Sequence, residues 1–214
     1  MSGAEPVGRW TGDFGREYTD RNSQGLEDLD ALYRQWFGVS RRELNGRFLS
    51  GLARGVRILE VGTNVGNQLL FLRELGFTNL CGVEIQRYAL ERSRARAVGV
   101  PVVQGTGSAL PFRDGAFDMV FTSGVLIHVP PAVLQRVLRE VYRCARTWVW
   151  GYEYFAADPT EVVYRGQSGL LWKADFSRLY REACPDLEVV REERLRYREA
   201  PNEDAMFLLR KAPR

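Results

Sequence analysis

The chain has 214 residues, of which 45% are hydrophobic and 27% are charged, so it can bury one core of ordinary size. The formal net charge is +3 with both signs interspersed, and neither a basic patch for nucleic acid nor an apolar run of roughly 20 residues for a membrane span is present. The three cysteines, Cys81, Cys144 and Cys184, include no CxxC pair, so we expect neither structural disulfides nor a metal site. Because the polar start also lacks signal-peptide features, we expect a cytoplasmic protein with no nucleic-acid or membrane partner.

Residues 1–54 are expected to form an N-terminal arm ahead of the main fold. Within this arm, the segment FGREYTDRN (14–22) reads as a polar loop. The pattern that follows predicts helices at about 26–37 and 40–53.

Strands and helices alternate from Val56 onward. The continuous apolar run VRILEV (56–61) is typical of a strand that is buried on both faces. Further strands are expected at 79–85, 101–104, 117–122 and 147–155, with helices at 66–75, 86–98, 130–144 and 174–183. Such alternation predicts an α/β fold with a mostly parallel sheet covered by helices on both faces. Two closing segments, 187–198 and 205–211, have only a short connection, which indicates an antiparallel pair.

The segment GTNVG (62–66) directly follows the first strand, where open parallel sheets bind their ligands. Asn64 and Asn67 replace two of the three glycines that a dinucleotide loop needs, and no lysine is near for a phosphate-binding loop. The looser E-x-G-x-x-x-G loop of S-adenosylmethionine enzymes fits Glu60 to Gly66, because an acid at the strand end suits the ammonium group of that cofactor. Asn64 tolerates a positive φ, so it can replace glycine in this turn. A purely structural turn is the alternative.

Later segments fit the same cofactor. Glu84 ends the second strand, where an acid accepts hydrogen bonds from ribose hydroxyls. The turn GTGSALPF (105–112) would flank the adenine, and Thr106 stands where an aspartate is common. SGVLIHV (123–129) would lie beneath the transferable methyl group. The contacts of S-adenosyl-L-methionine predicted in these segments are Glu60, Gly62, Thr63, Asn64, Gly66, Asn67, Glu84, Ile85, Thr106, Gly107, Ser108, Ser123 and Gly124.

Motifs along nearly the whole chain resemble the small class I methyltransferases known as pseudaminic acid biosynthesis-associated methylases. The resemblance is carried by GDFGREYTDRN, LEVGTNVGN, GVEI, FDMVFTSGVLIHVPP, VYRCA, EYF, VVYRGQ, LWKADF and FLLRK. It implies one methyltransferase domain over 1–214, with a seven-stranded, Rossmann-like class I core over 55–214 that the closing strand pair completes. It also implies that the arm, with Tyr18, Arg21 and Asn22, is a lid over cofactor and substrate, in which Arg21 and Asn22 would contact the cofactor. It does not fix the substrate, and relatives could act in other pathways, including antibiotic biosynthesis.

The catalytic residues are expected near the end of the strand at 117–122. His128 is the only histidine of the chain and follows that strand, so it is the first candidate for a general base or an acceptor-orienting group. Glu153 could bind a substrate hydroxyl or amine, or orient His128, and the lid would add Tyr18. The alternatives are a local hydrogen bond for His128 and an ion pair with an arginine for Glu153.

Two cations in the segment after the strand at 147–155 are expected to bind the substrate. Only Lys173 and Lys211 are lysines among the 30 basic residues, and Lys173 stands at an internal position. Arg165 and Lys173, with the nearby Tyr154, would suit an acidic sugar, a carboxylate or a phosphonate. Solvated surface charges are the alternative.

The sequence therefore predicts an S-adenosylmethionine-dependent methyltransferase. The acceptor would be an oxygen or nitrogen of a small, anionic or sugar-like metabolite in a saccharide or natural-product pathway, and the enzyme a monomer or homodimer. An RNA or DNA methyltransferase is disfavoured because Val129-Pro130-Pro131 lacks the [DN]-PP-[YFW] pattern. A cofactor-binding protein without catalysis is the remaining alternative; it would keep the loop and Glu84 but would not need His128.

Overall fold

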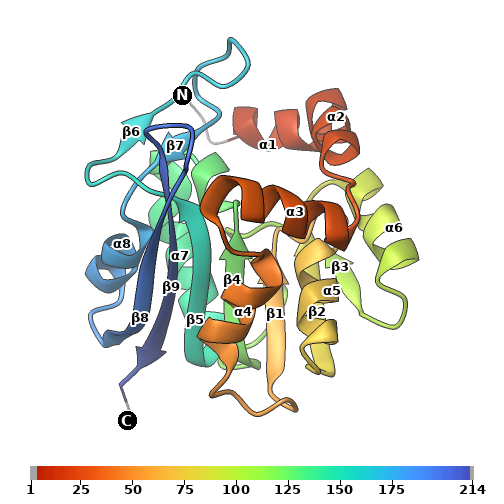
Figure 1. Ribbon diagram of the computed structural model, residues 1–214, viewed down its shortest axis with the longest axis vertical. Helices are drawn as coiled ribbons and strands as arrows, with labels where there is room; N and C mark the ends of the chain where they lie inside the picture. Colours follow the sequence, from red (N-terminus) through yellow and green to blue (C-terminus); the bar gives the residue numbers. More distant parts are fainter. Residues whose placement is uncertain (1–3, 213–214) are drawn as a thin grey trace.

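A seven-stranded sheet forms the centre of the structure, a computed structural model that describes residues 4–212 (Figure 1). Its strands are β1 (Arg57–Val61), β2 (Asn79–Glu84), β3 (Val102–Gln104), β4 (Phe117–Ser123), β5 (Ala145–Tyr154), β8 (Leu187–Arg196) and β9 (Glu203–Lys211). Their order across the sheet is β3-β2-β1-β4-β5-β9-β8. The expected strands and their antiparallel closing pair are confirmed.

The winding of the sheet reverses between β1 and β4. β1 pairs in parallel with both β2 and β4, so the chain leaves β3 on one side and continues to β5 on the other. β9 then pairs antiparallel with β5 and with β8. In an open α/β sheet, a ligand binds beyond the carboxyl ends of the strands at such a reversal. This is the seven-stranded, Rossmann-like sheet of class I methyltransferases.

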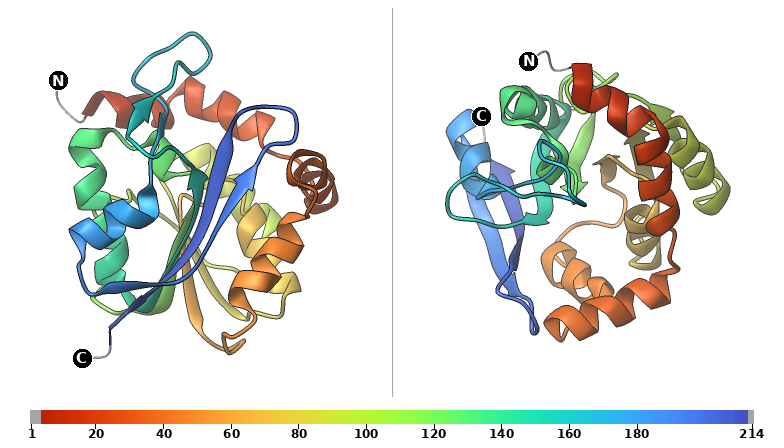
Figure 2. Two further views of the ribbon diagram at one scale, coloured as in Figure 1. Left: turned by 60° about the vertical axis from the view of Figure 1, so that its left-hand side comes forward. Right: turned by 90° about the horizontal axis from the view of Figure 1, so that it is seen from above.

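Helices cover both faces of the sheet, as the alternating pattern predicts (Figure 2). From residue 26 onward the helices are α3 (Leu26–Phe37), α4 (Arg41–Leu49), α5 (Asn67–Glu74), α6 (Arg87–Arg96), α7 (Pro131–Cys144) and α8 (Phe176–Ala183), with a 3₁₀ turn at Leu126–His128. Successive β1 residues point to opposite faces, so Ile58 packs with α3, α4 and α5 while Leu59 packs with α7 and α8. Within residues 4–212, no helix combines the length and the apolar character that crossing a bilayer requires.

The start of the arm is helical, which corrects the polar loop expected at 14–22. Helix α1 (Ala4–Thr11) and helix α2 (Asp13–Arg21) lie above the carboxyl ends of the strands (Figure 1). Trp10, Phe14 and Tyr18 recur every four residues, and their rings are in contact. Phe14 and Tyr18 share one face of α2, and Trp10 from α1 packs against both rings. This spacing is the signal that the polar composition concealed.

A second difference is a small hairpin between β5 and α8. Strands β6 (Thr160–Glu161) and β7 (Trp172–Lys173) pair antiparallel and lie apart from the main sheet. The loop that joins them contains Tyr164, whose ring lies 6.3 Å from that of Phe14 in α2. The hairpin and the arm therefore meet above the sheet.

Candidate active site

A cavity of about 340 Å³ lies beneath the arm at the carboxyl ends of β1, β2 and β4. The predicted cofactor residues that line it are Asn22, Glu60, Gly62, Thr63, Asn64, Asn67, Glu84, Ile85, Thr106, Gly107, Ser108, Ser123 and Gly124. Tyr18 and His128 of the predicted catalytic set also line it. Gly66 and Arg21 are not lining residues: Gly66 precedes α5, and Arg21 pairs with Glu17 at 3.5 Å.

The loop after β1 has the backbone shape that the sequence predicted. Asn64 has φ 48°, and Gly62 and Gly66 have φ 77° and 85°. A Cβ atom on Gly62 would lie 2.5 Å from Val125 Cγ2, so this position excludes a side chain on packing grounds as well. The prediction that Asn64 can replace a glycine in this turn is confirmed.

Glu84 ties this loop to the end of β2. Its side chain is buried, Oε2 accepts a hydrogen bond from Asn64 N at 2.7 Å, and Oε1 accepts one from Gln86 N at 2.8 Å. Burial raises the pKa of Glu84, and the hydrogen bonds from the backbone oppose this rise. The carboxylate is thus held at a fixed position on the cavity wall.

Several buried acceptors beside the loop have no hydrogen-bond partner. These atoms are Glu60 Oε2, Asn64 Oδ1 and Asn67 Oδ1. Burial raises the pKa of Glu60 well above its ordinary value, and the nearby Arg41 opposes the rise. Because buried polar atoms are normally paired, these acceptors fit a ligand that brings donors, such as an ammonium group and hydroxyls. S-adenosylmethionine carries both.

Arg41, a residue that the sequence analysis missed, is fully buried behind the cavity wall. Its guanidinium donates to Gln68 Oε1, Tyr33 Oη and Ser123 Oγ, each at 3.1 Å, and it lies 4.1 Å from the centre of the Tyr152 ring. Gln68, Tyr33 and Ser123 all line the cavity. Arg41 therefore positions three wall residues from α3, α5 and β4, and nothing in its sequence context distinguishes it from the many other arginines.

His128 lies on the 3₁₀ turn after β4, and a backbone carbonyl fixes its tautomer. Its Nδ1 lies 2.8 Å from Leu170 O, and because a carbonyl only accepts, Nδ1 carries the proton and Nε2 a free lone pair. Burial lowers the pKa of His128 to about 4. The imidazole is therefore neutral at pH 7, and Nε2 can accept a proton or a hydrogen bond.

Glu153 does not line the cavity but holds the turn that carries His128. It is fully buried, and its two carboxylate oxygens accept hydrogen bonds from Val125 N at 3.2 Å and Ile127 N at 3.4 Å. Burial raises its pKa to about 7. This corrects the three expectations for Glu153. It lies outside the cavity in which it would bind a substrate hydroxyl or amine, Leu170 O rather than Glu153 bonds the His128 ring, and no arginine of residues 4–212 forms an ion pair with it.

The residues predicted to bind the substrate lie outside the cavity. Arg165 is exposed at a tight turn, with φ 51°. Lys173 Nζ donates to Asn202 Oδ1 at 2.6 Å and lines a separate hollow near the β8–β9 connection. Tyr154 is half-buried and packs among core residues of the face that α7 and α8 cover. Arg165 and Lys173 belong to the β6–β7 hairpin, which is separate from the main sheet at whose edge the cavity lies.

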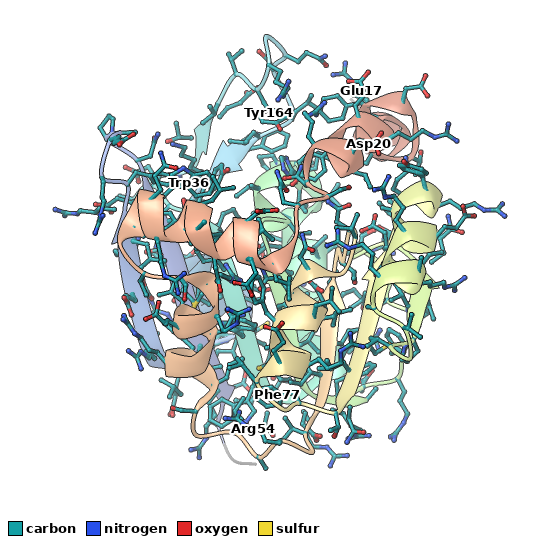
Figure 3. The ribbon with its side chains drawn as sticks, turned by 45° about the vertical axis from the view of Figure 1, so that its right-hand side comes forward. Glu17, Asp20, Trp36, Arg54, Phe77 and Tyr164 are labelled. Atoms are coloured by element: carbon teal, nitrogen blue, oxygen red, sulfur yellow. The ribbon has the colours of Figure 1, made fainter. Side chains whose placement is uncertain are left out.

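The arm covers the cavity and is held there by hydrogen bonds that its backbone carbonyls accept. Gln86 Nε2 donates to Trp10 O at 3.1 Å and Gly12 O at 3.0 Å, and Arg96 donates to the carbonyls that follow α2. Asp20, labelled in Figure 3, accepts from Tyr88 Oη at 2.7 Å. The arm is thus fastened along α6, and Trp10 and Gln86 join the cavity wall without having been predicted.

Comparison with known proteins agrees with this geometry. The family model described as "Methyltransferase domain" matches residues 59–147. An uncharacterized methyltransferase of Synechocystis sp. is 32% identical over 92 residues, which cover 43% of this chain and 43% of the relative. A sterol 24-C-methyltransferase of Schizosaccharomyces pombe is 26% identical over 147 residues, which cover 61% of this chain and 38% of the relative. The chain thus spans less than half the length of these curated relatives.

Solved structures resemble the whole fold. The 1,6-didemethyltoxoflavin-N1-methyltransferase of Burkholderia thailandensis, with its substrate and S-adenosylhomocysteine bound, has a TM-score of 0.74 at 17% identity and covers 100% of this chain and 92% of that one. The magnesium protoporphyrin IX methyltransferase of Synechocystis, also with S-adenosylhomocysteine, has a TM-score of 0.73 at 11% identity and covers 99% and 100%. The predicted cofactor, S-adenosylmethionine, agrees with these neighbours. The chain therefore has the class I methyltransferase fold, and its residues 59–147 match the methyltransferase family model.

Proposed function

We propose that the protein is an S-adenosylmethionine-dependent methyltransferase that methylates an oxygen or nitrogen of a small metabolite in a biosynthetic pathway. The observation that carries the proposal is one cavity with two chemically distinct parts. The loop after β1 and the end of β2 supply unpaired acceptors and a fixed carboxylate. On the same wall, His128 supplies a neutral imidazole with a free Nε2 lone pair.

The first part fits the cofactor. Glu84 would accept hydrogen bonds from the ribose hydroxyls, and Glu60 would accept from the ammonium group. Thr106 and Ser108, whose hydroxyls lie 3.2 Å apart, would flank the adenine. S-adenosylmethionine supplies a methyl group on a sulfonium sulfur, which departs as a neutral thioether when an oxygen or nitrogen takes the methyl group.

The second part prepares the acceptor. His128 Nε2 would accept the hydrogen bond of the acceptor O–H or N–H, and then its proton, so that the lone pair of oxygen or nitrogen is free to form the new bond. Tyr18, whose pKa is raised by burial, keeps its hydroxyl proton and is a donor that could orient the acceptor. Positioning of this kind supplies a large part of the rate in a displacement between two bound groups.

The acceptor class is argued from the cavity and from the relatives. The names of the relatives include a sterol, a toxoflavin precursor and a porphyrin as substrates, all of them small molecules. The prediction of an anionic or sugar-like acceptor rested on Arg165 and Lys173. Because both lie outside the cavity, that part of the prediction loses its structural support. We further propose that 1–214 act as one domain, with 1–54 as the arm and lid over the core at 55–214.

The test is calorimetry with S-adenosylhomocysteine, followed by transfer of a labelled methyl group to a panel of metabolites. We expect one binding site per chain, lost when Gly62 is replaced by Val, because that side chain would fill the turn. Gly99→Val is the matched control and should keep cofactor binding, because Gly99 is exposed and lies in open space at a similar φ of 84°. Absence of cofactor binding by the folded wild-type protein would contradict the proposal.

A further inference from the structure

We infer that the methyl acceptor is an uncharged, planar aromatic or heteroaromatic molecule with a ring O–H or N–H. The inference rests on the proposed function and concerns the part of the same cavity beside His128. A cluster of rings and the absence of lysine and arginine among the cavity's lining residues support it.

Five rings from three separate segments meet above the cavity and define what we call the ring cluster: Trp10, Phe14, Tyr18, His128 and Tyr164. The ring centres of Trp10 and His128 lie 4.5 Å apart, and those of Tyr18 and His128 5.7 Å apart, nearly perpendicular. Figure 3 shows Tyr164 on the hairpin loop beside the arm. Aromatic rings prefer such tilted and edge-to-face contacts with other rings. A planar acceptor can therefore extend the same pattern.

The cavity has no cation to balance an anionic acceptor. Among its lining residues in the described chain, Glu60 and Glu84 carry the carboxyl groups and none is lysine or arginine. The buried Arg41 lies behind the wall, and it donates hydrogen bonds to Gln68, Tyr33 and Ser123 instead. A carboxylate or phosphate next to the neutral His128 would lose its hydration without gaining a charged partner, which is costly.

Two polar atoms in the ring cluster require partners in the acceptor. Trp10 Nε1 is buried and has no hydrogen-bond partner, so it offers a donor. His128 Nε2 offers an acceptor, since Nδ1 donates to Leu170 O. A heteroaromatic or phenolic molecule presents an O–H or N–H and a lone pair in the ring plane, so it can satisfy both. A ring system without a polar group would fill the space but leave these groups unpaired, which costs stability in the complex. An aliphatic alcohol could also pair with both, so the preference for an aromatic acceptor rests on the ring–ring contacts.

The experiment uses the full chain saturated with S-adenosylhomocysteine and three probes of known chemistry. These probes are 2-naphthol, its saturated counterpart trans-2-decalol, and D-glucuronate. Dissociation constants are measured by calorimetry and by tryptophan fluorescence. We expect 2-naphthol to bind about ten-fold more tightly than 2-decalol, because ring–ring contacts add to burial of the same skeleton. Glucuronate should show no measurable binding.

Two variants connect the preference to the ring cluster. Phe14→Leu and Tyr164→Leu keep an apolar side chain but remove a ring that packs against a lining residue, Trp10 for Phe14 and His128 for Tyr164. Each should lower the ratio of the two dissociation constants, because the lining ring loses the contact that orients it. Neither residue lines the cavity, so affinity for S-adenosylhomocysteine should remain as in the wild type and report on folding. Trp148→Leu is the matched control, because the half-buried Trp148 lies near the amino end of β5, away from the carboxyl ends of the strands, and should leave the ratio unchanged.

The outcomes separate the two proposals. Equal affinity for 2-naphthol and 2-decalol, binding of glucuronate, or no binding of any probe to the cofactor-loaded protein would overturn the aromatic acceptor and leave the methyltransferase proposal standing. If S-adenosylhomocysteine itself does not bind, the methyltransferase proposal fails instead.

Discussion

The two halves of the cavity are built in different ways. The half with Glu60, Asn64 and Glu84 comes from the ends of β1 and β2 and the turn after β1, and backbone N–H groups fix the Glu84 carboxylate. The half around His128 comes from the arm, the 3₁₀ turn and the β6–β7 hairpin, which lie far apart in the sequence, and rings dominate it. Cofactor chemistry is thus set by local sequence, whereas acceptor chemistry depends on tertiary packing.

The largest expected effect comes from removing the polar group of the acceptor half alone. His128→Ala removes the Nε2 lone pair, so turnover should fall about 100-fold or more, as for loss of a general base. Affinity for S-adenosylhomocysteine should change by less than about two-fold, since the acceptors of the other half are untouched. Steady-state kinetics and calorimetry on the same preparation measure both. Full turnover in this variant would remove the base role and favour an acceptor that is already ionised.

A substitution at Arg41 tests whether the cofactor half of the cavity forms independently of the helices before β1. Arg41→Met leaves the oxygens of Gln68, Tyr33 and Ser123 without their buried donor. We expect the free energy of unfolding to fall by about 3 kcal/mol, measured by urea titration. Arg47→Met on the same helix is the control, because Arg47 is exposed and its loss should cost less than about 1 kcal/mol.

If the Arg41 and Arg47 variants unfold alike, then the buried guanidinium is not a positioning group. A second readout is the dissociation constant of S-adenosylhomocysteine, which should rise for Arg41→Met because three wall residues lose their fixed orientation. The conservative Arg41→Lys keeps the charge but cannot reach all three oxygens with a planar fork. Its affinity should therefore lie between those of wild type and Arg41→Met.

A smaller effect is expected when the cofactor half is changed. Glu84→Ala removes the acceptor of Asn64 N and the predicted ribose contact, so S-adenosylhomocysteine should bind about 10 to 100-fold more weakly by calorimetry. Glu91→Ala, an exposed change on the next helix, is the control. Unchanged affinity in Glu84→Ala would mean that the cofactor is wrongly placed. Turnover at saturating cofactor should fall less than in His128→Ala, which is the contrast between the halves.

The same contrast explains what the sequence could predict. The positions of the strands, their burial and the positive φ of Asn64 follow from local patterns. Buried parallel strands and tight turns directly restrict which residue types can occur in them. The roles of Glu153 and Arg41 do not, because a buried charge is recognised by its partners and these come from distant segments. Lys173 was misplaced for the same reason: its rarity in the composition carries no information about the direction of a hairpin.

The smallest expected effect is the pH dependence of wild-type stability, because His128 and Glu153, in and beside one turn, change it in opposite directions. The pKa of His128 falls from 6.5 to about 4 on burial, so its contribution to stability is present above pH 6.5 and is lost as the pH falls towards 4. The pKa of Glu153 rises from 4.5 to about 7, so its contribution is present below pH 4.5 and is lost as the pH rises towards 7. The two changes oppose each other between pH 4.5 and 6.5.

Single variants should therefore reveal a dependence on pH that the wild type conceals. In Glu153→Gln, the free energy of unfolding should fall by about 2–3 kcal/mol, relative to wild type, from pH 6.5 to 4.5, because only His128 then titrates in the turn. In His128→Gln it should fall by a similar amount in the opposite direction, as the pH rises from 4.5 to 6.5. Urea titrations at these two pH values measure both slopes. Parallel profiles for the wild type and both variants would show that the two groups do not titrate in the folded turn as their burial requires.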